Sequence, residues 1–223
     1  MDVQELQKLV RQGEGQHLEF KLKSNHPEKI IREVVAFANT EGGTLLIGVS
    51  DNKEVKGLKF PEEDEYLLTK AIHQYCFPTI NYTLEHIAID ENYEREVLAF
   101  HIPKSIIAPH YVLRSEDIQV RKVYVRVEDR SIQASKEMRE VLKQTKKDKN
   151  FCFSYGEKEQ LLMTYLASHA QITLEQFADL AQISRKIASR TLVLLVLANV
   201  LKIMPEEKQD YFVINPTVDI LAS

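Results

Sequence analysis

The spacing of apolar residues predicts four helices in the first two thirds of the chain. In each segment the apolar positions recur three or four residues apart, so that they line one face of a helix. Pro27 and Pro61 stand at two expected helix starts, where the missing N–H costs nothing, and Ser135 is an expected N-cap. The expected helices are Val3–Gln12, Pro27–Asn39, Pro61–Tyr75 and Lys136–Lys147.

Strands are expected between these helices, because other segments alternate or run apolar over short lengths. In His17–Leu22, Leu18, Phe20 and Leu22 share one face, while Glu19 and Lys21 share the other. Thr44–Val49 is an almost continuous apolar run, which is typical of a strand covered on both faces. Further strands are expected at Tyr82–Ile89, Glu96–Ile102 and Val120–Val127, the first two pairing around a turn.

The pattern changes after the charged stretch Lys146–Asn150, which is the best linker candidate. Three helices and a hairpin are expected beyond it: Glu157–Ala167, Leu174–Ala181, Arg185–Ala198, and the pair Val200–Met204 and Tyr211–Ile214. This order is typical of a winged helix. The sequence therefore predicts an α+β fold in two domains, a mixed-sheet domain at 1–148 and a small winged-helix domain at 149–223.

Composition narrows the function classes only in part. A hydrophobic share of 44% supports a packed core, and the net charge of −4 offers no global basic field for nucleic acid, so any such interface must be a local patch. No apolar run reaches membrane-spanning length, and no membrane partner is expected. The acidic start of the chain does not fit a secretory signal, which predicts a cytoplasmic protein with Cys76 and Cys152 reduced.

Three motifs together resemble the Schlafen/AlbA-type DNA-binding domain family. They are Glu14-Gly-Gln-His-Leu-Glu-Phe-Lys21, then Phe37-Ala-Asn-Thr-Glu-Gly-Gly-Thr-Leu-Leu-Ile-Gly-Val-Ser-Asp51, then Tyr124-Val-Arg-Val127. The resemblance covers about residues 5–145 and implies a DNA-binding protein, a transcriptional regulator in many bacterial members. The turn after the third motif, Glu128-Asp-Arg-Ser131, departs from the small glycine- and serine-rich turn of the family and weakens the case for DNA contact at that loop.

The same resemblance carries an alternative, a metal-dependent nuclease. Schlafen proteins with ribonuclease activity use three carboxylates of these motifs, and the matching residues here are Glu14, Glu19 and Asp51. Clustered carboxylates could hold Mg²⁺ or Mn²⁺, and Lys21 could hold the phosphate. Otherwise Glu19 and Lys21 form a solvated strand face and Asp51 is a turn residue. No cofactor or zinc site is expected outside the nuclease alternative, and Gly42-Gly43 is interpreted as a tight turn rather than a phosphate loop.

Basic residues supply the candidates for a nucleic-acid interface. In the first domain these are Arg121, Lys122, Arg126 and Arg130, with a second group at Lys136, Arg139, Lys143, Lys146 and Lys147. At the start of the third helix of the winged helix, where such helices enter the major groove, they are Arg185, Lys186, Ser189 and Arg190. DNA is the expected partner, RNA is the alternative, and a solvated face is the competing interpretation of each group.

The third helix of the second domain is apolar almost all round in its later turns. A helix in a monomer buries one stripe, so Val193 and Val196 are candidates for a partner surface. The leading hypothesis is therefore a cytoplasmic, homodimeric, DNA-binding transcriptional regulator without enzymatic activity. The nuclease is the first alternative. A protein-interaction module without a nucleic-acid partner is the second, favoured by the interleaved acidic residues.

Overall fold

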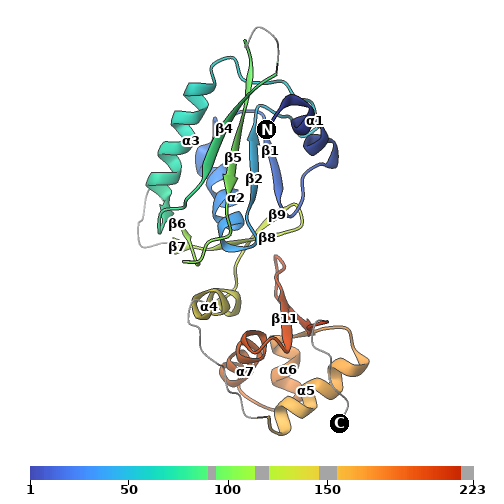
Figure 1. The fold of residues 1–223 in the computed structure, drawn as a ribbon. Helices are drawn as coiled ribbons and strands as arrows, with labels where there is room; N and C mark the ends of the chain where they lie inside the picture. Colours follow the sequence, from blue (N-terminus) through green and yellow to red (C-terminus); the bar gives the residue numbers. More distant parts are fainter. Residues whose placement is uncertain (90–93, 114–120, 146–154, 217–223) are drawn as a thin grey trace. The chain divides into compact units, whose positions relative to one another are not determined.

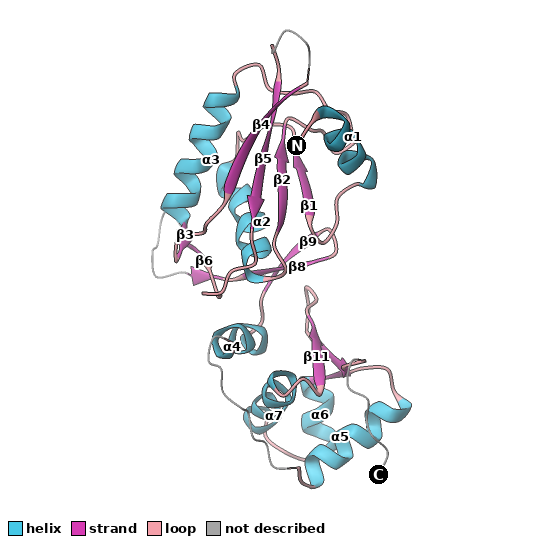
Figure 2. Cartoon of the chain, in the orientation of Figure 1, coloured by secondary structure: helices cyan, strands magenta, loops and turns pink. Residues whose placement is uncertain are grey.

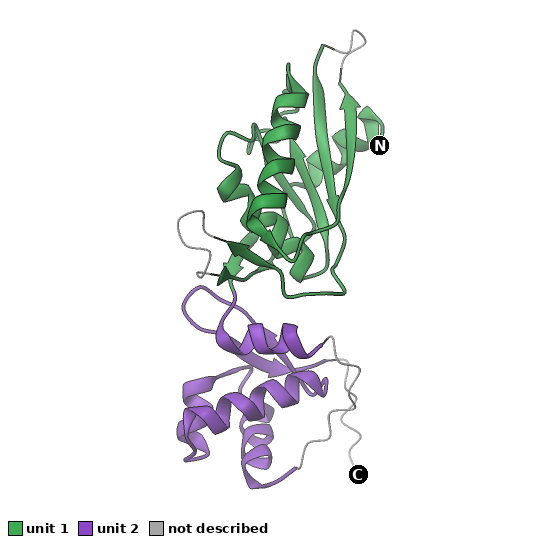
Figure 3. Cartoon of the chain, turned by 90° about the vertical axis from the view of Figure 1, so that its left-hand side faces the viewer, with its two compact units in different colours: residues 1–133 green, residues 134–223 purple. Residues whose placement is uncertain are grey.

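The computed structural model describes residues 1–89, 94–113, 121–145 and 155–216. The chain divides into two compact units, residues 1–133 and 134–223, and each is described by itself (Figure 3). The division falls before helix α4 (Lys136–Gln144), whereas the expected domain boundary at residues 148 and 149 falls after it. The reason is packing, because Met138 of α4 joins the core of the second unit.

Among its described residues, the first unit combines three helices with nine strands (Figures 1 and 2). Its helices are α1 (Val3–Gln12), α2 (Pro27–Asn39) and α3 (Pro61–Tyr75), with the bounds that the apolar spacing predicts. Its strands are β1 (Leu18–Lys21), β2 (Gly43–Ile47), β3 (Cys76–Phe77), β4 (Thr83–Ala88), β5 (Glu96–Ile102), β6 (Tyr111–Leu113), β7 (Arg121–Lys122), β8 (Tyr124–Val127) and β9 (Arg130–Gln133).

A four-stranded mixed sheet in the order β1-β2-β5-β4 forms the frame of this unit. β1 and β2 run parallel and are joined through α2, with Glu19 opposite Leu45. β2, β5 and β4 then run antiparallel, which confirms the expected pairing of the segments around residues 82–102. The short strands form two smaller sheets, β3-β6-β7 and β8-β9. The fold is α+β, as predicted.

The strand β2 is buried on both of its faces, as its continuous apolar run predicts. Leu45 and Ile47 join α2 and α3 in one hydrophobic cluster. Leu46 and Val49, the latter just beyond the strand, join α1 in another, together with Phe20. Helices therefore cover both faces of the sheet, and period-2 alternation sorts the side chains of β2 between the two clusters.

The glycine turn between α2 and β2 serves packing. Gly42 has φ +77°, and a Cβ there would lie 2.7 Å from the carbonyl oxygen of Ile102. A Cβ on Gly43 would collide with the ring of Phe37. The buried Asn39 side chain donates to the carbonyls of His110 and Tyr124, so the end of α2 is tied to β8. The turn is a close backbone approach, as interpreted from the sequence.

The described part of the second unit contains four helices and a three-stranded sheet in the order β10-β12-β11. After α4 come α5 (Glu157–Ser168), β10 (Ile172–Thr173), α6 (Leu174–Leu180), α7 (Arg185–Leu197), β11 (Leu201–Met204) and β12 (Tyr211–Ile214). Its core contains Phe177, Leu192 and Phe212. Within the described residues, no helix of either unit is long and apolar enough to cross a membrane.

Candidate functional site

A buried charge cluster joins β8 to β1 and α2 in the first unit. The side chain of Arg126 on β8 is 0% exposed, and its guanidinium lies 2.7 Å from Glu19 Oε2 and 2.8 Å from Glu33 Oε2. It also donates to the backbone carbonyls of Gly15 and Leu18 and lies over the ring of Phe37. These partners use the donors of the guanidinium, and no face of it is open to a phosphate. The prediction that Arg126 binds nucleic acid is thereby corrected.

The face of β1 that carries Glu19 and Lys21 is covered, although the alternation suggested a solvated face. Glu19 is 5% exposed and bonds with both Arg126 and Lys21. The carboxylate of Glu14 accepts the N–H of Phe20 at 2.8 Å. Burial raises the pKa of Glu14, and the neighbouring Glu19 adds to the rise. Glu14 and Glu19 therefore lie close together, as the family motifs suggest.

The third carboxylate of the expected nuclease set does not complete a metal site. Asp51 is exposed in the turn after β2. In the part of the chain that the structure describes, no three His, Cys, Asp or Glu side chains are grouped so that they could hold a metal ion. Both oxygens of Glu19 already bind cationic side chains. The arrangement of Glu14, Glu19, Asp51 and Lys21 therefore does not fit Mg²⁺ or Mn²⁺.

The remaining basic candidates of the first unit are spread over short strands. Arg121 is exposed and its guanidinium lies 5.0 Å from the centre of the Phe77 ring. Lys122 is half-buried on β7, and Arg130 is exposed at the start of β9. Because Arg126 is buried, only Arg121, Lys122 and Arg130 remain of the predicted group. A phosphate could reach Arg121 and Arg130, since both side chains are exposed.

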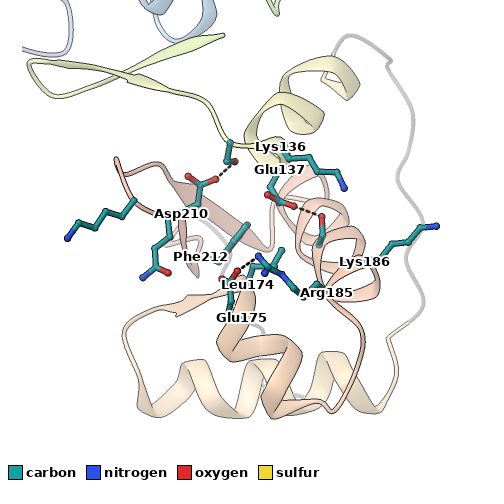
Figure 4. Close-up of a pocket in the computed structure, with 12 residues that line it drawn as sticks. Lys136, Glu137, Leu174, Glu175, Arg185, Lys186, Asp210 and Phe212 are labelled. Carbon is teal, nitrogen blue, oxygen red and sulfur yellow. Dashed lines mark hydrogen bonds and ion pairs between the residues drawn. The ribbon is translucent and has the colours of Figure 1, made fainter. Parts of the chain in front are cut away.

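The second unit brings its candidates together around a pocket of about 500 Å³ (Figure 4). The starts of α4, α6 and α7 meet the segment between β11 and β12 there. The pocket is lined by Ser135, Lys136, Glu137, Leu174, Glu175, Arg185, Lys186, Ser189, Lys208, Gln209, Asp210 and Phe212. Three of the four residues predicted on the third helix are in this set, and the fourth, Arg190, is exposed one residue further along α7.

Each carboxylate of this pocket has a hydrogen-bond partner within the unit. Glu137 accepts from Ser189 Oγ at 2.5 Å, Glu175 pairs with Arg185, and Asp210 accepts from Ser135 (Figure 4). Burial raises the pKa of Asp210, while the hydrogen bond from Ser135 acts in the opposite direction.

The cations of the same face are mostly unpaired. Lys136, Lys186, Arg190 and Lys208 are exposed and form no ion pair with any described residue. Of the four residues predicted on α7, Arg185 and Ser189 are engaged within the unit, while Lys186 and Arg190 are available to a ligand. Lys146 and Lys147 of the predicted basic group lie outside the described residues.

The apolar surplus of α7 is buried inside the second unit. Val193 is 4% exposed, and Val196 packs against the core. The helix α4 packs against α7 and covers the face that the sequence assigned to a partner. The assignment of Val193 to a dimer surface is thereby corrected, because a helix of the same chain supplies the second buried face.

Several residues of these sites were not predicted from the sequence. Glu33 is three residues after Ile30 and four before Phe37, so it lies on the buried face of α2, which is a readable sign of a buried partner. Ser131 donates to Glu33, and no sequence signal marks it. The same holds for Ser105 and His110, whose side chains meet at 2.6 Å in a loop of the first unit.

A family model described as Schlafen, AlbA_2 matches residues 14–135, more than half of the chain and nearly all of the first unit. Among solved structures, the chain is similar to the DIP2311 protein from Corynebacterium diphtheriae. The identity is 21%, the TM-score is 0.40, and the match covers 58% of this chain and 24% of that one. The chain thus spans about a quarter of the length of that structure.

Proposed function

Because the chain belongs to the Schlafen AlbA_2 family, we propose that it is a DNA-binding protein in which the second unit, acting as a winged helix, makes the contact. The order helix, strand, helix, helix, hairpin from α5 to β12 supports this assignment. In this arrangement α7 is the helix that enters the major groove, and the segment between β11 and β12 is the wing.

The observation that carries the proposal is the set of four unpaired cations around α7. Lys136, Lys186, Arg190 and Lys208 come from α4, α7 and the wing, and none has an ion-pair partner among the described residues. Phosphate contacts dominate the affinity of proteins for DNA and tolerate any base sequence. Since the net charge of the chain is −4, such a local patch is the kind of interface that its composition allows.

The role that we propose is transcriptional regulation in the cytoplasm by a homodimer. A dimer would double the phosphate contacts and would impose two half-sites about one helical turn apart. The apolar surface that suggested the dimer is buried by α4. The dimer therefore stays a prediction with no assigned surface. Light scattering on the purified chain tests it: a mass near twice 25.8 kDa supports a dimer, and a mass near 25.8 kDa contradicts it.

Fluorescence anisotropy with a labelled DNA duplex of about two helical turns, or ~21 base pairs, tests the function. The matched variants are Lys186→Ala and Lys202→Ala, which each remove one exposed lysine from the second unit. We expect binding at low salt that Lys186→Ala weakens and Lys202→Ala preserves. A folded wild-type chain that binds no duplex at low salt contradicts the proposal and favours the interaction module. Stronger binding to an RNA duplex of the same length would reassign the partner.

A further inference from the structure

A small pocket in the first unit lies beside a serine and a histidine that the proposed function does not use. The pocket has a volume of about 200 Å³. Two loops form it, residues 79–81 and residues 103–107, and His110 closes it. Ile80, Pro103 and Ile107 give it apolar walls, and Ile106, which also lines it, is 92% exposed.

The hydrogen bonds of His110 fix which of its ring nitrogens carries the proton. Nδ1 lies 2.7 Å from the carbonyl oxygen of Pro78, and a carbonyl oxygen can only accept. In the neutral ring Nδ1 is therefore the protonated nitrogen, and Nε2 is the one that accepts a hydrogen bond. Ser105 Oγ lies 2.6 Å from Nε2, so the serine hydroxyl donates to it.

This arrangement satisfies the geometric requirements of an activated nucleophile. A hydroxyl lies within hydrogen-bond reach of a neutral imidazole, and a third group, the Pro78 carbonyl, orients that imidazole. His110 is 1% exposed, so water cannot easily replace the serine as its partner. Ser105 is only half-buried and lines the pocket.

A donor for the developing oxyanion stands next to the serine. The N–H of Ile107 donates to Ser105 Oγ at 3.1 Å and occupies one lone pair of that oxygen, leaving the other for attack. The N–H of Ile106 donates no hydrogen bond to any residue that the structure describes. The amide that follows a nucleophilic serine is a common oxyanion donor.

We propose that Ser105 and His110 form a nucleophile–base pair that hydrolyses esters of short acyl chains. The serine oxygen attacks the ester carbonyl carbon while its proton passes to Nε2 of His110. The bond to the alcohol then breaks, and the alcohol leaves with that proton. Water attacks the acyl-serine and gives one proton to Nε2. The bond from the acyl carbon to Ser105 Oγ then breaks, Nε2 returns the proton to Oγ, and the carboxylic acid leaves. The volume of the pocket equals that of roughly six or seven waters, which limits the acyl group to a few carbons.

The test uses the full chain and a fluorophosphonate probe, which forms a stable bond with activated serines only. The variants are Ser105→Ala and His110→Gln. The matched control is Ser168→Ala, because Ser168 also contacts a histidine ring, that of His169 at 3.0 Å, but lies exposed on α5. Labelling is located by peptide mass spectrometry, and hydrolysis of p-nitrophenyl acetate is followed in parallel. Circular dichroism confirms that each variant is folded.

We expect the probe to label the wild type at Ser105 and the Ser168→Ala variant equally fast. Ser105→Ala abolishes the label, and His110→Gln slows it about 100-fold or more, the usual contribution of a general base. A folded wild type that is labelled no faster than Ser105→Ala, or that is labelled at another serine, overturns the proposal. The wild type alone can give this negative result, so the proposal can be refuted even if a variant does not fold. DNA binding is measured separately, so the two functions fail independently.

Discussion

Replacing Arg126 by methionine should destabilise the first unit strongly. Methionine resembles the apolar stem of arginine but is shorter and lacks the guanidinium with all of its donors. It leaves Glu19, 5% exposed, and the largely buried Glu33 without their main cationic partner. Removing one partner of a buried ion pair costs about 3–5 kcal/mol, because the other charge stays buried and uncompensated.

A loss near 4 kcal/mol would lower the melting temperature of a unit of this size by roughly 10–20 °C. The matched control is Arg130→Met, four residues along the same hairpin, where the side chain is exposed. Exposed substitutions of this kind stay within about 0.5 kcal/mol. The assay is urea unfolding followed by circular dichroism, with the transitions of the two units fitted separately.

The pH dependence of the loss provides a second reading of the same variant. Burial raises the pKa of Glu33 in the wild type, and the loss of Arg126 should raise it further. A carboxyl with a raised pKa binds its proton more tightly in the folded state, so lower pH favours folding at this residue. The loss should therefore be smaller near pH 4.5, close to the ordinary value of a glutamate, than at pH 7. A loss below about 1 kcal/mol at pH 7, or one equal to that of Arg130→Met, would refute the reasoning.

Three further predictions concern single residues. His86 bridges two carboxylates, and although burial lowers its pKa, these hydrogen bonds outweigh burial and raise it. His86→Gln should therefore lower the free energy of unfolding by about 0.5 kcal/mol below pH 6.5, a small value because the side chain is partly exposed. This loss should fade as the pH rises through the raised pKa. Equal losses at pH 5.5 and pH 9 in urea unfolding would contradict the prediction. Val193→Asp should unfold the second unit, because it buries an unpaired charge. If the variant instead stays folded and only its oligomeric mass changes in light scattering, Val193 belongs to a dimer surface after all. Glu137→Gln should strengthen DNA binding severalfold in anisotropy by removing a negative charge beside Ser189, whereas weaker binding would show that this carboxylate does not oppose DNA.

The helices of the fold were readable from the sequence because long amphipathic periods and their caps are local signals. The bounds of α1, α2 and α3 follow from apolar spacing and from proline at the start of α2 and α3. The two-residue strands β3 and β10 were not predicted, because so short a segment has no period and forms only where a partner strand lies beside it. The single strand expected at Val120–Val127 contains two strands, β7 and β8. The boundary after residue 133 was missed because α4 is polar enough to belong to either unit, and tertiary packing decides.

The candidate sites were less readable, because burial of charge depends on contacts far apart in the sequence. Alternation alone could not show that Glu19 faces Arg126, which follows it by 107 residues. For the same reason Arg126 was grouped with exposed basic residues. In the second unit the positions at the start of α7 were foreseen, since the order of elements indicates which helix end is presented. The hydrogen bond from Ser189 to Glu137 of α4 was not predicted, because the sequence analysis assigned α4 to the other domain.

The salt dependence of DNA binding is the most direct test of the claim that the second unit carries the interface. Anisotropy titrations between 50 and 200 mM salt, roughly the range in which phosphate contacts dominate, give the slope of log affinity against log salt. The variants are Lys186→Ala with Arg190→Ala, and Arg121→Ala with Arg130→Ala. Each lost phosphate contact should reduce the slope by about 0.9. We predict a reduction near 1.8, twice that value, for the pair in the second unit and none for the pair in the first. An unchanged slope for the second-unit pair, with the reduction found in the first-unit pair instead, would contradict the account.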